Sequence, residues 1–409
     1  MTLDPVHVDG IARLASAIAA DVDDGDHADL AETAWGWLDP LRRDGATVLE
    51  PLGEQRLRAV GVDDVALAAS PFETAHGLDS GTINPTTFKN GLVLDVAQAA
   101  MAAVPSDLDL HRSRSLVATV HTNDVTTDHD HDWTAYDEGF SRRRVLHAPR
   151  VNRFAEGVVH ALSLYLAESE HALEHADAVT DLLLLDGPIY PKELLNWQDR
   201  DPELSDLARE AKPRSVLENY VRLVERFVER DVPLAGFVKN PSAKVITRTL
   251  RETGVEAPWA DDTGLFTRLL ERREDGQRRE DQLTFTSWFV SRGGADRTLA
   301  ADGDALGVER RLDPGAYEVT FFVVYDPRRD VCYKVEAPHA VTREAETREA
   351  LTAHVLRDVA ATRGPPEAVA KADELARVGA AEKAALRRKF EERFDSESVR
   401  TYDDVRWGG

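Results

Sequence analysis

The stretch Leu182-Leu183-Leu184-Leu185-Asp186-Gly187 decides the fold class of this chain. An apolar run that stops at an acidic residue followed by glycine places that acid at the mouth of a buried strand. An ion that needs several oxygen ligands can be held there. Two further carboxylates are candidates for the same ion: Asp79, inside Gly77-Leu78-Asp79-Ser80-Gly81, and Glu156, on a long helical stretch.

Strands and helices are predicted on both sides of this run. From Ala75 onward the helical pattern gives way to strands, and Lys89-Asn90-Gly91 is typical of a tight hairpin. The predicted order is three meandering strands, a helix, a strand, a helix and a strand, over residues 82–88, 91–97, 115–121, 151–174, 182–185, 216–230 and 234–239. This is the order of a ribonuclease H-like core, an α/β fold with a mixed sheet flanked by helices.

The chain is expected to divide into a helical extension and a main domain. Apolar residues recur at helical spacing from Val8 to Val22 and from Ala31 to Leu41. Residues 1–70 should therefore form an N-terminal helical extension that packs on the main domain, which covers 71–409. The core of the main domain spans about 75–254, and its C-terminal elaboration, 255–409, adds strands and then helices.

The composition is strongly acidic. Asp and Glu number 74 against 50 Lys and Arg, which gives a formal net charge of −24. Such a surface stays soluble where concentrated salt screens charge repulsion, so a salt-loving source is expected; the alternative is an ordinary acidic protein. The charge balance argues against an unaided grip on nucleic acid, because neutralising phosphates needs a basic face. A local basic channel remains compatible with it.

Cysteine content and hydropathy indicate which kinds of site and which cellular location are expected. The single cysteine, Cys332, excludes intrachain disulfides and a cysteine-based zinc site. No basic-then-apolar signal opens the sequence, and no apolar stretch approaches the roughly 20 residues that span a bilayer. We therefore expect a cytoplasmic protein with no membrane partner.

Four segments in order resemble the NurA family, archaeal and bacterial nucleases associated with the repair of DNA double-strand breaks. They are Gly77-Leu78-Asp79-Ser80-Gly81, Leu184-Leu185-Asp186-Gly187-Pro188-Ile189, Ala235-Gly236-Phe237-Val238-Lys239-Asn240 and Tyr333-Lys334-Val335-Glu336-Ala337-Pro338. Each segment alone is a weak signal, whereas the ordered set is much stronger. The likeness spans about Ala75 to Ala380.

The resemblance implies a metal-dependent deoxyribonuclease with 5′-to-3′ exonuclease and some single-strand endonuclease activity. It also implies a homodimer that acts with a HerA-type hexameric helicase when DNA ends are resected. The expected cofactor is Mn²⁺ or Mg²⁺, held by Asp79, Glu156 and Asp186. By the same resemblance, Lys239 could hold a phosphate oxygen or the leaving group; the alternative is an ion pair with one of the acids of the site.

The helical acid has two candidates. Arg153 and Glu156 resemble an Arg-x-x-Glu pattern of the family, whereas Glu168 lies among other acids on what looks like a solvated helix end. We predict Glu156 as the ligand and keep Glu168 as the alternative.

A fourth ligand is expected near the C-terminus. The family carries a Tyr-Pro…Ala-His signature there, whose histidine is a metal ligand. Here Pro365 replaces the tyrosine and Asp373 the histidine. Asp373 still offers an oxygen ligand, and four carboxylates favour magnesium or manganese.

Three alternatives stay open. A loop rich in Asp and His could chelate a transition ion but is expected to be an exposed acidic loop; its residues are His121, Asp124, Asp128, His129, Asp130, His131 and Asp132. Asp79-Ser80-Gly81-Thr82 also resembles the first phosphate loop of actin-like ATPases and sugar kinases. Finally, the replaced Tyr and His could mark a catalytically weakened interaction subunit of the HerA motor.

Overall fold

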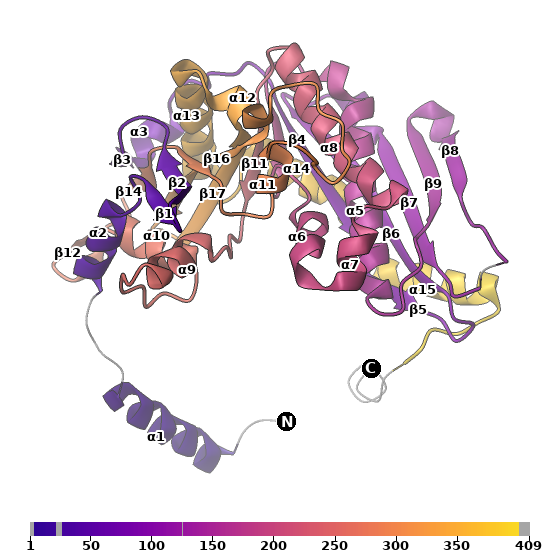
Figure 1. Ribbon diagram of the computed structural model, residues 1–409, viewed down its shortest axis with the longest axis horizontal. Helices are drawn as coiled ribbons and strands as arrows, with labels where there is room; N and C mark the ends of the chain where they lie inside the picture. The colour runs from indigo at the N-terminus through magenta and orange to yellow at the C-terminus, as the bar shows by residue number, and fades with distance from the viewer. Residues whose placement is uncertain (1–3, 22–26, 125, 401–409) are drawn as a thin grey trace.

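The leucine run forms the central parallel strand of a large mixed sheet (Figure 1). The structure is a computed structural model, and it describes residues 4–21, 27–124 and 126–400. Strand β10 (Leu183–Asp186) lies between β4 and β11 and runs parallel to both. The neighbouring strands are β4 (Ala75–Thr82), β5 (Thr86–Thr87), β6 (Val93–Val104), β7 (Arg114–His121) and β11 (Leu234–Val238). The predicted α/β class is confirmed.

The order of the central strands is β11-β10-β4-β6-β7. The first three strands of the core pair antiparallel, and β10 and β11 then add on the other side of β4. This order is compatible with the expected ribonuclease H-like arrangement. Because β4, β10 and β11 are parallel, their C-terminal ends meet at one edge of the sheet.

Both faces of the central strands are covered. Leu183 and Leu185 pack in a core with helices α5 (Ala155–Glu174) and α8 (Ala211–Glu229). Leu184 packs on the opposite face with α13 (Ala345–Thr362) and α14 (Glu367–Ala376). Burying each leucine contributes about 2 kcal/mol, so a run of leucines specifies a strand covered from both sides.

The sheet continues well beyond this core. Beyond β11 lie β17 (Val331–Pro338), β16 (Val319–Asp326), β15 (Phe289–Ser291), β2 (Ala46–Pro51) and β1 (Leu41–Arg43). β14 (Gln282–Thr286) also pairs with β16, and β3 (Leu57–Gly61) pairs with β14. Beyond β7 lie β9 (Ser141–His147) and β8 (His131–Tyr136). The remaining elements are α3 (Val62–Ala66), α4 (Leu108–Arg112), α6 (Lys192–Arg200), α7 (Pro202–Leu207), α9 (Val245–Glu252), α10 (Asp262–Leu270), β12 (Arg273–Glu274), β13 (Gln277–Arg278), α11 (Arg297–Ala300), α12 (His339–Thr342) and α15 (Ala380–Phe394).

The N-terminal residues differ from the expected helical extension. Helices α1 (Pro5–Asp21) and α2 (Ala28–Gly36) are present, while Val22, the predicted end of the first helix, lies outside the described residues. Residues 41–61 form β1, β2 and β3, and β2 pairs with β15 more than 200 residues away. Such long-range pairing leaves no trace in helical periodicity. Helix α2 packs against α10, but the large apolar side chains of α1 are exposed.

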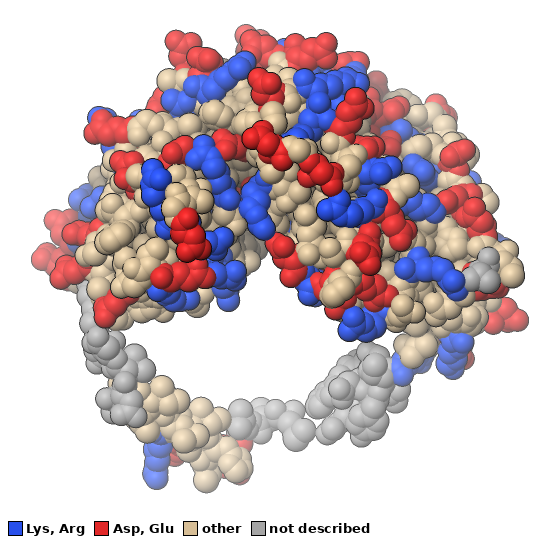
Figure 2. Space-filling view, viewed as in Figure 1, with Lys and Arg blue, Asp and Glu red and all other residues tan. Residues whose placement is uncertain are grey.

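The molecule is hollowed on one side. Figure 2 shows the hollow between two lobes, one carrying α9 and α10 and the other α6 and α7 in the same view of Figure 1. Over the described part of the chain, no helix has the length and apolar character that crossing a membrane requires.

Candidate metal centre

Two glycines bring helix α14 onto strand β4. Residues 77, 79 and 81 share one face of the strand, because side chains alternate along it. A Cβ atom at Gly77 would lie 2.1 Å from the carbonyl oxygen of Ala368, and one at Gly81 would lie 2.2 Å from that of Ala376. The helix therefore rests directly on the backbone of β4, and Asp79 projects from between the glycines toward it. The strand expected at 82–88 begins where β4 ends, and β4 itself covers Ala75–Thr82 and carries Asp79.

Three carboxylates meet at this contact. Asp186 ends β10 on the same face as Leu184, and Asp373 lies on α14 between Ala368 and Ala376. One ligand oxygen from each of Asp79, Asp186 and Asp373 lies within 4.8 Å of the others, so the group can hold a metal ion. The structure thus brings together three of the four predicted metal ligands, from positions 79, 186 and 373 of the sequence.

The electrostatics of the cluster favour a bound cation. Burial, followed by the charges of Asp186 and Glu168, raises the pKa of Asp79 to about 9. Burial also raises the pKa of Asp186, although Lys239 opposes that shift. Like charges held close together in a half-buried site repel, and a divalent cation removes the repulsion. Carboxylate oxygens are hard ligands, so the donor set fits magnesium or manganese.

Lys239 lies at the cluster as well. It follows β11, and its Nζ lies 2.5 Å from Asp186 Oδ2 and 3.8 Å from Asp373 Oδ1. Burial lowers the pKa of Lys239, but the hydrogen bond and charge of Asp186 more than compensate, and the net shift is upward. Of the two alternatives for Lys239, the structure shows the ion pair with the acids of the site, and this places its ammonium group at the cluster.

Arg377 is a neighbour that the sequence did not suggest. It lies one turn after Asp373 on the chain and forms an ion pair of 2.6 Å with it. Burial raises the pKa of Asp373, whereas Arg377 and then Lys239 lower it, and the net shift is downward. Asp373 is therefore the most acidic member of the cluster.

The structure does not bring Glu156 to the cluster. Glu156 is exposed in the first turn of α5 and accepts a hydrogen bond of 2.7 Å from the hydroxyl of Thr87. Glu168 lies 12 residues further along the same helix, about 18 Å at 1.5 Å per residue. It accepts hydrogen bonds from the hydroxyls of Ser80, at 2.6 Å, and Tyr220, at 2.8 Å. Glu168, the alternative candidate, is therefore the acid of α5 that contacts strand β4 next to Asp79.

Glu168 carries a perturbed carboxyl group. Burial raises its pKa to about 7, although the hydrogen bonds from Ser80 and Tyr220 lower it and the charge of Asp186 adds to the rise. Helical spacing places Glu168 on the core face of α5, seven residues after Ala161 and four before Ala172, both of which are buried. This spacing is the signal in the sequence that could have identified Glu168, because it places an acid on the buried side of the helix.

The loop rich in Asp and His does not form a metal cluster within the described residues. His121 is buried and accepts a hydrogen bond of 3.3 Å from the backbone N–H of Val151. Asp130 pairs with Lys212 at 2.6 Å, and Asp124 and Asp128 are exposed. Residues 131–136 belong to strand β8 instead of continuing the loop.

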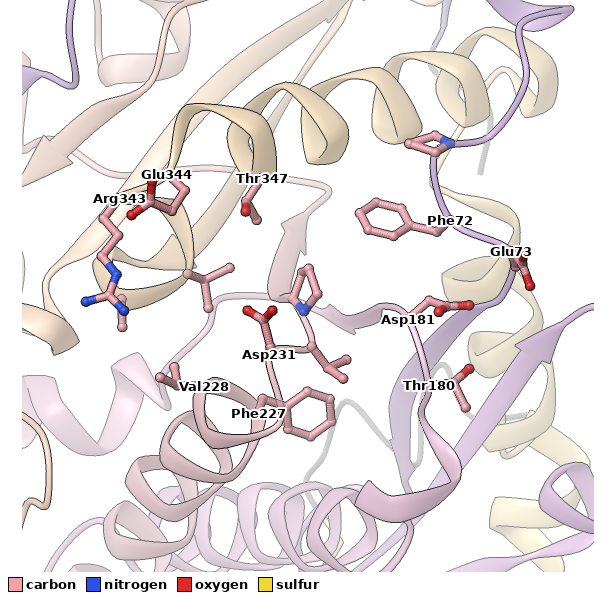
Figure 3. A pocket seen from close by; sticks show the side chains of 15 residues that line it. Phe72, Glu73, Thr180, Asp181, Phe227, Val228, Asp231, Arg343, Glu344 and Thr347 are labelled. Carbon is pink, nitrogen blue, oxygen red and sulfur yellow. The ribbon is translucent and has the colours of Figure 1, made fainter.

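Two cavities lie at opposite ends of the parallel strands. One, of about 330 Å³, adjoins the cluster and is lined by Lys239, Pro365, Asp373 and Arg377, among others. A larger one, of about 460 Å³, lies beside the N-terminal ends of β4, β10 and β11, where Phe72 and Asp181 line it (Figure 3). The cavity that adjoins the carboxylates is the one suited to a substrate of the metal centre.

Fold and site together define a class of protein: a mixed α/β protein with a carboxylate cluster for a divalent cation at the C-terminal edge of its parallel strands. The family model of the NurA domain matches residues 73–378, which is well over half of the chain. The chain belongs to the NurA family, a family of nucleases, as the sequence predicted.

Solved structures of this family are similar to the chain. The NurA nuclease from Sulfolobus solfataricus is 12% identical, with a TM-score of 0.48 over 96% of this chain and 98% of that one. A NurA structure with manganese is 11% identical, with a TM-score of 0.45 over 95% and 98% of the two chains. A NurA bound to dAMP and manganese is 12% identical, with a TM-score of 0.44 over 83% and 91%. None of the curated proteins compared with this sequence matches it.

Proposed function

We propose that the chain is a divalent-metal-dependent deoxyribonuclease that hydrolyses phosphodiester bonds at DNA ends. The observation that carries the proposal is the meeting of Asp79, Asp186 and Asp373 within 4.8 Å, with Lys239 beside them. Membership of the NurA family supports DNA as the substrate.

Phosphodiester hydrolysis needs a nucleophilic water near neutral pH and stabilisation of the charge on the leaving oxygen, and a bound divalent cation supplies both. In this chain Asp79, Asp186 and Asp373 would hold the cation. Lys239, charged and partly exposed, would contact a non-bridging phosphate oxygen or the leaving group. Glu168 would complete the acidic site from α5, in the role first assigned to Glu156.

We propose the more specific properties of this chain from its membership of the family. They are 5′-to-3′ exonuclease activity with endonuclease activity on single strands, a homodimer, and action with a HerA-type helicase in resecting double-strand breaks. Manganese is the proposed cofactor, with magnesium as the alternative, because NurA structures with manganese are known. A partner that moves the DNA would supply affinity that a chain of net charge −24 lacks. The working environment is proposed to be a cytoplasm rich in salt.

The phosphate-loop alternative is not favoured by the geometry. Asp79-Ser80-Gly81-Thr82 lies within strand β4 instead of forming a loop. The space beside Gly81, where a nucleotide phosphate would approach, is filled by the carbonyl of Ala376. An ATP-binding measurement on the whole chain should therefore give no signal.

The proposal is tested by digesting an end-labelled DNA duplex in high salt with manganese. Asp79→Ala should lower the rate by about a hundredfold or more, because it removes a ligand shared by the whole cluster. The surface substitution Asp63→Ala, which removes an exposed charge elsewhere, should leave the rate unchanged. Equal rates for the wild type and Asp79→Ala would refute the proposal.

A further inference from the structure

A buried group of charges lies one strand away from the metal centre, and the mechanism above does not use it. Lys334 and Glu336 share one face of β17, and Lys192 is the first residue of helix α6. Both lysines bind the same oxygen of Glu336, Oε1, and the Lys334 contact measures 2.7 Å. The other oxygen, Oε2, is buried and has no hydrogen-bond partner among the described residues. We call these three residues the lysine pair and its carboxylate.

The lysine pair has more N–H donors than its carboxylate uses. Two ammonium groups offer six N–H donors, and both contact the same oxygen of Glu336. Within the described residues, neither lysine forms an ion pair with any other carboxylate. The buried Asp296 supplies a second negative charge that acts on both lysines without forming an ion pair with them. The donors that remain on the exposed side of the lysines can therefore bind a further acceptor.

The lysines are reachable from outside although their partner is not. Glu336 is fully buried, whereas the side chain of Lys192 is 32% exposed and that of Lys334 is 14% exposed. The ammonium group of Lys334 also lies 4.3 Å from the centre of the Phe321 ring, which fixes its position. Glu336 thus acts as a buried anchor that holds two partly exposed cations side by side.

The position of the lysine pair relates it to the metal centre. Lys334 is paired in register with Val238, the residue before Lys239, and strand neighbours lie about 5 Å apart. Lys192 follows Asp186 by six residues, across the turn that leaves β10. β17, α6 and α11 converge in the middle of Figure 1, and Figure 2 shows Lys and Arg side chains gathered there, at the top of the hollow. Lys334 and Glu336 face α6, on the side of the sheet opposite to Asp186, so the lysine pair and the carboxylate cluster flank the C-terminal edge of the parallel strands from its two faces.

We propose that Lys192 and Lys334 bind a backbone phosphate of the DNA strand whose neighbouring phosphodiester lies at the carboxylate cluster. This inference rests on the proposed nuclease function. A chain of net charge −24 needs a local group of cations in order to bind a polyanion, and the lysine pair would supply it. Glu336 is a positioning residue in this arrangement, because it holds the lysines and does not touch the DNA.

The decisive experiment compares a substrate that has one phosphodiester with a substrate that has many. Bis(4-nitrophenyl) phosphate and a single-stranded oligothymidylate are hydrolysed by the whole protein with manganese. Lys192→Gln should raise the KM for the oligonucleotide about tenfold, the loss expected for one charge-assisted contact, and leave hydrolysis of the small substrate unchanged. Lys192→Arg should restore much of the loss. An unchanged KM for the oligonucleotide would overturn the inference, as would an equal loss with both substrates.

The salt dependence of binding gives a second readout. On single strands each neutralised phosphate contributes about 0.7 to the slope of log Kd against log salt concentration. Lys192→Gln and Lys334→Gln should each lower that slope by up to about this amount. The matched control is Lys212→Gln, because Lys212 is 33% exposed and pairs with Asp130 on a different part of the molecule. A slope identical to the wild type in both lysine variants would count against the contact.

Failure of the inference is separable from failure of the nuclease proposal. If the wild type hydrolyses neither substrate, the nuclease proposal fails. If it hydrolyses both, and the lysine variants match it on the oligonucleotide, only the inference fails. The thermal midpoint of every variant is measured alongside. If Lys334→Gln unfolds, Lys192→Gln tests the inference by itself, because Lys192 is partly exposed at the start of α6.

Discussion

The hydroxyl of Ser80 donates a 2.6 Å hydrogen bond to Glu168 across the interface between strand β4 and helix α5. Ser80 follows Asp79, whose carboxylate accepts a 2.7 Å hydrogen bond from the backbone N–H of Ser80. The two acids therefore lie on opposite faces of one strand and share a residue that bonds to both. Through this link Glu168 is tied to the metal centre from the α5 side.

Glu168→Gln should lower manganese-dependent hydrolysis by about 10- to 100-fold, the usual cost of removing an acid that supports a metal site. The fold should persist, because glutamine has the same shape: its oxygen can accept one of the two hydrogen bonds made by Ser80 and Tyr220, and its NH2 group can donate to the other hydroxyl oxygen. Glu156→Gln on the same helix is exposed and should leave the rate within about twofold. Initial rates on the same labelled duplex measure both, and the reverse ranking would reinstate Glu156.

Gly77→Ala should separate helix α14 from strand β4. The added Cβ would meet the backbone of Ala368 at 2.1 Å, so the helix must shift, at a cost of about 1–3 kcal/mol. Asp373 moves with the helix, and affinity for manganese should fall together with stability. Gly157→Ala is the matched control, since nothing lies within 4 Å of its Cβ and alanine favours a helix. Urea unfolding and manganese titration give the two quantities, and an undisturbed Gly77→Ala protein would contradict the close packing.

Asp373→Ala should weaken manganese binding by about 10- to 100-fold, because one of three clustered carboxylates is lost. The control is Glu367→Ala in the first turn of the same helix, where the acid forms an i,i+4 pair with Lys371 and lies outside the cluster. Calorimetric titration of the folded proteins with manganese measures both affinities. Unchanged manganese affinity in Asp373→Ala would remove this residue from the ligand set.

Glu336→Gln should cost stability that depends on pH. Burial raises the pKa of Glu336, but Lys192 and Lys334 lower it more strongly, to about 2 from 4.5. The unfolded chain therefore binds more protons than the folded one between these values. The stabilisation, about 3 kcal/mol, is fully present above pH 4.5 and is lost as the pH falls toward 2. The difference in free energy of unfolding between wild type and variant should shrink over that range in urea titrations. A constant difference would show that the charge of Glu336 is not stabilised by its lysines.

The sequence predicts those features that local chemistry dictates. Four leucines before Asp186 specify a strand covered on both faces, and the acid at its end lies in the cluster. Lys239 could be placed because a cation that closes an apolar strand needs a partner. Asp373 depended on resemblance, since nothing in its own surroundings points to a site almost 300 residues away along the chain.

What the sequence did not predict depends on packing between distant segments. Nothing in the sequence around the glycines of β4 indicates that α14 rests on them. β2 is a strand because β15 pairs with it, although the preceding residues have a helical pattern. Glu168 looked like part of a solvated helix end because acids surround it, whereas Ser80 and Tyr220 reveal a buried carboxyl.

Helix α14 has a consequence for the order of events during protein synthesis. The last of the three clustered acids is synthesised almost 300 residues after the first, and it reaches its partners only when this helix settles on the glycine-lined strand. Nascent and prematurely terminated chains that end before the helix carry an incomplete set of ligands. A complete carboxylate cluster therefore requires a chain that extends through this helix.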